Sequence, residues 1–168
     1  MVKATKDNRP FSSGVFDLEE FNIYTKVIDL PLDGIPTYLE EGINGVCTGG
    51  SALFNVFSNK RRVVKNDLIT IFPYQLASIT EISTDFAVIF FKVPKKLFMD
   101  TINGLGRLTL DYFFYMRKYY SSPLSEEEYK RFVHFCHILS CRVDLSCAFL
   151  RRESVMYLLR VLGLVCGL

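Results

Sequence analysis

Histidine, the commonest side-chain ligand of metal centres, is scarce in this sequence. It has two histidines in 168 residues, His134 and His137, and both follow the strand-rich part of the chain. Histidines three apart on a helix can share a metal, but no third ligand lies at a matching spacing. We therefore predict two partly exposed helix histidines and no bound metal.

Motifs for covalent chemistry are missing as well. No GxSxG sequence occurs, and Cys47 has no sequence neighbour that would lower the pKa of its thiol. Gly49-Gly50 is not followed by the Lys-Ser/Thr pair of a phosphate-binding loop. The sequence thus predicts a protein that is not an enzyme and has no cofactor.

Signals for export or membrane insertion are also lacking. The five cysteines are irregularly spaced and include no CxxC pair, which favours reduced thiols over a disulfide framework. The N-terminal sequence has no apolar segment typical of a signal peptide. The longest strongly apolar run, 161–168, is shorter than the roughly 20 residues of a membrane span. We therefore expect a cytoplasmic protein.

Neither sign of charge is in large excess. The chain has 20 basic and 18 acidic residues and a net charge of +2, whereas a dedicated nucleic-acid surface would be more basic. The basic triplet Lys60-Arg61-Arg62 is expected in a solvated turn between two strands. Contact with a phosphate or an acidic partner is the alternative for this triplet.

Apolar and aromatic residues, in contrast, are abundant. The sequence is 49% hydrophobic, with 15 Phe and 9 Tyr, which is enough for one core without disulfides. Short β-branched and aromatic runs alternate with turn residues, a pattern typical of an antiparallel barrel or sandwich. The predicted strands lie at 24–30, 37–39, 43–47, 52–57, 62–64, 68–72 and 86–93.

Strand periodicity predicts which side chains are buried. In the strand at 52–57, alternation places Ala52, Phe54 and Val56 in the interior. The strand at 86–93 has no polar alternation before Lys92, so we expect it to be covered on both faces. The C-terminal half of the chain is expected to provide the outer cover.

Helices are predicted in that C-terminal half. One begins near Pro94, one or two turns are expected within 107–120, and Ser125 with Glu128 forms a capping box for the next. A last helix, 151–168, carries an apolar stripe. We expect that stripe to form a dimer interface, with packing on the chain's own barrel as the alternative; it consists of Val155, Leu158, Leu159, Leu162 and Val165.

The order of these elements resembles the cupin-like N-terminal domain of AraC-type transcriptional regulators, particularly those of gut Bacteroides-type bacteria. The likeness rests on the turn at Thr48-Gly49, the hairpin at 52–64 and the segment 66–73, which is similar to the family's GDL-hydrophobic-Pro motif. Asn66 replaces the usual glycine there, and Asn also accepts left-handed backbone. The metal histidines of cupin enzymes are absent, because Ala77 occupies one position and none lies near 36–39.

This resemblance implies a division into regions. An N-terminal arm at 1–16 would precede a cupin-like (jelly-roll) β-barrel at 17–94, and a helical region at 95–168 would pack on the barrel as a helical hairpin and dimerise. The barrel would sense a small-molecule effector, such as a sugar or another metabolite. DNA would be bound only through a helix-turn-helix domain beyond residue 168.

The alternation of side chains along the predicted strands gives a set of candidate residues for an effector pocket. This assignment depends on the register, because a slip of one residue reverses the direction of every side chain. Two other interpretations of the chain stay open: a free-standing cupin-like enzyme with a non-histidine metal site or no metal, and a dimerisation module without a ligand. In the last case the candidate residues only fill the core. The candidate pocket residues are Phe11, Tyr38, Phe54, Val56, Thr70 and Phe72.

Overall fold

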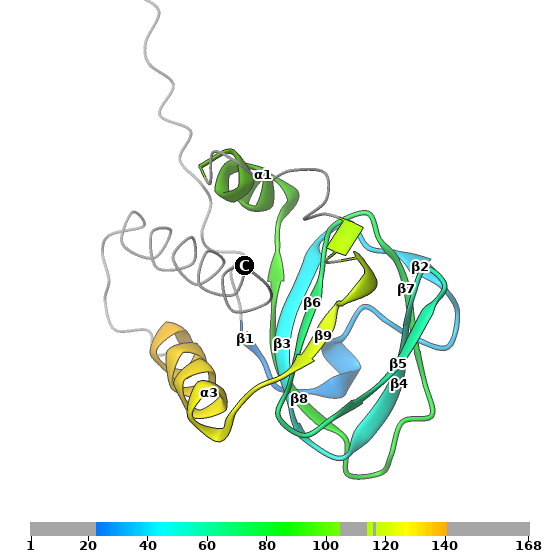
Figure 1. Ribbon diagram of the computed structural model, residues 1–168, viewed down its shortest axis with the longest axis vertical. Helices are drawn as coiled ribbons and strands as arrows, with labels where there is room; N and C mark the ends of the chain where they lie inside the picture. The colour runs from blue at the N-terminus through cyan, green and yellow to red at the C-terminus, as the bar shows by residue number, and fades with distance from the viewer. Residues whose placement is uncertain (1–22, 105–113, 116, 141–168) are drawn as a thin grey trace, which may run out of the picture.

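The computed structural model of the chain describes residues 23–104, 114–115 and 117–140, which form two stacked antiparallel sheets with helices on one outer side (Figure 1). One sheet has five strands in the order β1-β8-β3-β6-β9, and the other has four in the order β2-β7-β4-β5. The predicted fold class, mainly β with C-terminal α structure, is confirmed. No described strand is hydrogen-bonded across the two sheets, so the predicted closed barrel is an open sandwich.

All elements are short, as the close spacing of turn residues predicts. The helices are α1 (Lys95–Gly104) and α3 (Glu126–Ser140), and a 3-10 turn covers Val27–Asp29. The strands are β1 (Ile23–Tyr24), β2 (Thr37–Tyr38), β3 (Gly42–Gly49), β4 (Ser51–Val56), β5 (Asn59–Val64), β6 (Asp67–Ile71), β7 (Leu76–Thr80), β8 (Ala87–Val93) and β9 (Ser121–Pro123).

Two corners with positive φ explain why the sheets stay separate. The chain leaves the five-stranded sheet at Gly50 (φ 62°) and returns to it at Asn66 (φ 74°), so each ladder ends where the chain turns. A Cβ atom at position 50 would lie 2.5 Å from the backbone nitrogen of Phe86, which only glycine avoids. The left-handed backbone expected at Asn66 is confirmed, and the β3–β8 ladder shifts register between Cys47 and Gly49, where the sequence indicates the turn at Thr48-Gly49.

Two local predictions are wrong. Only Tyr24 of the predicted strand at 24–30 lies in a strand, because the chain forms the 3-10 turn directly afterwards. The basic triplet 60–62 is solvent-exposed but lies within β5, since the pairing of Val56 with Asn59 leaves a hairpin loop of only Phe57 and Ser58. The helical turns expected within 107–120, in contrast, are present at 114–115 and 117–118 in the described part, and Tyr120 after them lies in the core.

The space between the sheets holds the main core. β4 alternates as predicted, with Phe54 and Val56 completely buried and Ser51 at its partly exposed edge. Aromatic rings fill much of the layer: Phe54 meets Phe86 edge to face at 6.3 Å between ring centroids. Side chains from both sheets therefore interdigitate in one apolar layer.

A second apolar layer lies on the outer side of the five-stranded sheet. Phe90 and Phe91 of β8 point to opposite faces and are both completely buried, the first in the inner core and the second under the helices. Figure 1 shows α1 and α3 on that outer side, away from the four-stranded sheet. Leu97 of α1 and Phe132 of α3 belong to this layer, which confirms that the C-terminal half covers β8.

The predicted capping box starts α3. The Ser125 backbone nitrogen donates to the Glu128 carboxylate at 2.8 Å, and the Glu128 nitrogen donates to the Ser125 hydroxyl at 3.3 Å. The hydrogen bonds from Ser125 hold the pKa of Glu128 below its ordinary value. Both groups therefore fix where α3 begins.

Strand β9 was not predicted, and its position depends on Tyr120. This completely buried side chain places its phenol oxygen 2.9 Å from the carbonyl oxygen of Phe54 and 3.0 Å from that of Asn59. Both carbonyls belong to the four-stranded sheet region, whereas β9 pairs with β6 in the other sheet. Tyr120 thus joins the two sheets at an edge where no strand does so.

Replacing Tyr120 with phenylalanine should lower the free energy of unfolding by about 1–2 kcal/mol, because the buried Phe54 carbonyl and the partly buried Asn59 carbonyl lose the hydroxyl that lies within hydrogen-bond distance of both. Burial raises the phenol pKa to about 12 from the ordinary 10.0. The wild-type advantage should therefore be complete below pH 10 and should shrink as the pH rises from 10 towards 12, where the unfolded phenol ionises first. Urea unfolding of both proteins at neutral pH and at about pH 11 measures the difference; a pH-independent difference would contradict this role of the hydroxyl.

Candidate functional site

The predicted pocket residues do not gather in one place. Phe54 and Val56 lie in the core between the sheets, whereas Thr70 and Phe72 lie on the helix-facing side of the five-stranded sheet. Tyr38 is 67% exposed on the edge strand β2. Phe11 and the predicted dimer stripe at 155–165 lie outside the described residues.

The alternation of side chains along β6 explains why the candidate pocket residues are divided between two layers. Ile69 and Ile71 belong to the inner core and Leu68 to the outer layer, so by alternation Thr70 faces the helices. Phe72 contacts Phe98 of α1 with 4.8 Å between ring centroids, on the same outer side. The predicted inward orientation of Thr70 and Phe72 is therefore wrong by one residue of register.

This correction reveals a polar pair beneath the helices. Asn44 of β3 and Thr70 of β6 are directly opposite each other in the ladder, 4% and 7% exposed. Among the described residues, the Asn44 Oδ1 and Thr70 Oγ atoms have no hydrogen-bond partner. Each unsatisfied buried group costs about 1–3 kcal/mol, so this is a polar island in an otherwise apolar layer. A water or a ligand hydroxyl between sheet and helices would satisfy it.

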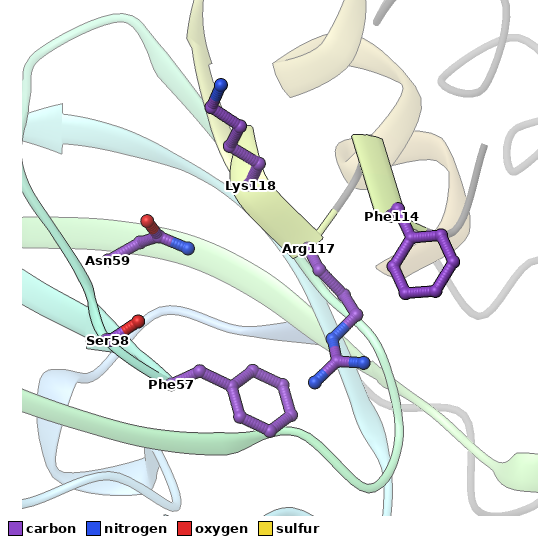
Figure 2. A pocket seen from close by; sticks show the side chains of 6 residues that line it. All are labelled: Phe57, Ser58, Asn59, Phe114, Arg117 and Lys118. Carbon is purple, nitrogen blue, oxygen red and sulfur yellow. The ribbon is translucent and has the colours of Figure 1, made fainter. Parts of the chain in front are cut away.

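An open pocket lies at a different place, beside the β4–β5 hairpin (Figure 2). Its volume is about 440 Å³, within the range of small-molecule sites. Two of its residues come from the hairpin loop, one is the first residue of β5, and the others come from the helical segment that precedes Tyr120. The lining residues are Phe57, Ser58, Asn59, Phe114, Arg117 and Lys118.

Cations and aromatic rings are paired around this pocket. The Arg117 guanidinium carbon lies 3.9 Å from the centroid of the Phe57 ring, and the Lys118 ammonium lies 5.2 Å from that of Tyr119. Arg61 of β5 donates to the backbone oxygen of Ser121 at 2.6 Å. Sequence reasoning missed this site because its two halves are almost sixty residues apart; the only signals were the basic triplet and the adjacent Arg117-Lys118 pair.

Reactive groups are buried or scattered in the described part of the chain. Burial raises the pKa of the Cys47 thiol, and it raises that of Cys136 to about 12, so neither forms the reactive thiolate at neutral pH. His134 and His137 are exposed on α3, as predicted. Within the described residues, no three histidine, cysteine or acidic side chains gather as metal ligands, and none of the helices could cross a membrane.

No protein-family model and no curated protein matches the sequence. Among solved structures, the chain is similar to apo ToxT K231A from Vibrio cholerae, with 11% identity and a TM-score of 0.53 over 80% of this chain and 53% of that chain. It also matches the AraC-like transcriptional activator CuxR, with 12% identity and a TM-score of 0.45 over 84% of this chain and 52% of that chain.

That likeness is one of fold. Hazelnut (Corylus avellana) vicilin also matches, with 13% identity and a TM-score of 0.36 over 53% of this chain and 26% of that chain. The predicted resemblance to the N-terminal domain of AraC-like regulators is confirmed at the level of the fold. The chain spans about half the length of the two regulators it matches.

Replacing Thr70 with valine should raise the free energy of unfolding by about 1 kcal/mol, because a buried hydroxyl without a partner is exchanged for a methyl group. Urea unfolding measures the change. The exposed Thr80 is the matched control, and its change to valine should alter stability by less than about 0.5 kcal/mol. Destabilisation of the Thr70 variant would mean that a bound molecule accepts or donates a hydrogen bond there.

Proposed function

We propose that this chain is the regulatory domain of an AraC-like transcriptional regulator, where it senses a small-molecule effector and forms a homodimer in the cytoplasm. The observation that carries the proposal is the fold match to ToxT over 80% of the chain. The absence of a metal-ligand cluster among the described residues, and the buried state of Cys47 and Cys136, fit a recognition role better than a catalytic one.

In this proposal the regions divide the work. The arm at 1–16 and the helical region at 95–168 change position, while the sandwich holds the effector. The sandwich consists of the strands within 17–94 together with β9 at 121–123. DNA is contacted only through a separate domain beyond residue 168. An effector changes the output only when it binds one arrangement of these parts better than another.

A second candidate function is a dimerisation module without an effector. The specific observation in its favour is the dense inner core, where Phe54, Val56 and Tyr120 are all completely buried. Under this interpretation the side chains between the sheets only stabilise the fold.

Effector sensing is tested by a thermal-shift screen of the 168-residue chain against sugars and other small metabolites. A true effector should raise the melting temperature progressively with its concentration, since a ligand at 100 times its Kd adds about 2.7 kcal/mol of stability. It should also change amide hydrogen exchange in the arm and in α3. A ligand that stabilises the chain but leaves the exchange of both regions unchanged would contradict the switching mechanism.

Dimerisation is tested by sedimentation of the Leu158→Asp variant, since Leu158 lies in the centre of the proposed stripe. The wild-type chain should sediment as a dimer and the variant as a folded monomer, because a charge is costly in an apolar interface. Ile28→Asp is the matched control, at a side chain that is 87% exposed, and it should stay dimeric. A folded Leu158→Asp variant that remains a dimer would place the interface elsewhere.

A further inference from the structure

Three cations near the pocket of Figure 2 have no carboxylate partner among the residues that the structure describes. Arg61, Arg117 and Lys118 form no ion pair with any acidic residue in the described part of the chain, and their observed partners are rings and one backbone oxygen. The neighbouring Arg62, in contrast, is ion-paired with Glu81. The pocket is therefore lined by positive charge that the described residues leave uncompensated, and an anion would compensate it.

Arg117 is held in an orientation that suits a carboxylate. Its guanidinium packs on the Phe57 ring at 3.9 Å, which fixes the planar group while its N–H edges stay available. A fixed guanidinium can donate two parallel hydrogen bonds to one carboxylate, at a smaller loss of side-chain entropy than a free one. Lys118, which lines the same pocket, adds a second positive charge.

The backbone at Phe57 supports the same conclusion. Phe57 is the first residue of the two-residue hairpin loop and has a φ of 55°, a conformation that usually selects glycine there. A bulky side chain in this region costs about 1 kcal/mol or more, and such strain is concentrated at functional sites. The ring that bears this strain is the one on which Arg117 rests.

The remaining walls suit a flat apolar body. Figure 2 shows Phe114 on the other side of the Arg117 guanidinium from Phe57, with Ser58 and Asn59 further along the wall. Phe114 is 61% exposed, so an occupant of the pocket would cover apolar surface that now faces water. A neutral sugar would leave both cations uncompensated and would gain little from these rings.

We propose that this pocket binds a small organic anion with a planar apolar body, its carboxylate on Arg117 and Lys118 and its body against Phe57 and Phe114. The role of this anion as the effector rests on the proposed sensing function. Binding itself depends only on the pocket.

The test uses isothermal titration of the 168-residue chain with 2-naphthoate as the probe, and with 2-naphthamide and inorganic phosphate as comparisons. We expect saturable binding of 2-naphthoate that is about tenfold or more tighter than that of either comparison compound, since only this probe has both the charge and the ring. Absence of saturable binding at millimolar concentration, or equal binding of 2-naphthamide or phosphate, would overturn the proposal.

Two glutamine substitutions separate the pocket from general electrostatics. Arg117→Gln should weaken 2-naphthoate binding by about tenfold or more. Arg131→Gln removes the same charge from an exposed position on α3 and should change binding by less than about twofold. Unchanged binding by Arg117→Gln, or an equal loss in Arg131→Gln, refutes the site.

The Phe57→Gly variant tests the role of the Phe57 ring with little risk of unfolding the chain. Glycine suits the φ of 55°, so the loss of ring packing is offset by relief of backbone strain, and the variant should remain folded while binding weakens as in Arg117→Gln. A folded Phe57→Gly variant with full affinity argues against the stacked arginine. If the pocket fails these tests while the chain still dimerises and responds to another effector, the proposed function survives without it.

Discussion

Strand β8 must be covered on both faces, and the rest of the architecture follows from that requirement. Phe90 and Phe91 are adjacent, point to opposite sides and are both completely buried. Burial of an aromatic side chain of this size is worth about 2–3 kcal/mol. One side requires the four-stranded sheet and the other requires α1 and α3. The helices are therefore part of the hydrophobic core, and they cannot move without changing contacts that stabilise β8.

The inner and outer faces of a strand could be assigned correctly from the sequence only where one face carries polar residues. β4 alternates Ser51 and Asn55 with apolar side chains, so its inner face could be read from the sequence, as could the turn chemistry at Asn66. Apart from Asp67 at its start and Thr70, β6 is apolar on both faces, so hydrophobic periodicity cannot show which face of the strand points inward. Thr70 and Phe72 were assigned to the candidate effector pocket from this ambiguous segment, and the candidate residues are divided between two layers for this reason.

Other features depend on tertiary contacts that have no local signature. The sequence of β9, Ser121–Pro123, has little intrinsic preference for a strand and is held by pairing with β6 and by the buried Tyr120 hydroxyl. The basic-aromatic pocket likewise forms only when the β4–β5 turn meets the segment around Arg117. The local sequence pattern predicts most of the helices and strands. β9 and the pocket, in contrast, depend on contacts between segments that are far apart in the sequence.

The pocket and the helices are connected by a short, well-anchored stretch of chain. Arg117 is three residues before Tyr120, whose hydroxyl is bound to the four-stranded side, and β9 follows at once. At the far end, the Leu124 nitrogen donates to the Asn66 oxygen at 3.0 Å, and the Asn66 amide donates to Glu126 at 3.1 Å in the first turn of α3. These hydrogen bonds attach the segment between Arg117 and α3 to the strands and to the corner at Asn66. A displacement of Arg117 should therefore also displace the start of α3. A ligand that binds one position of this segment more tightly would therefore also favour one position of the helix that covers β8.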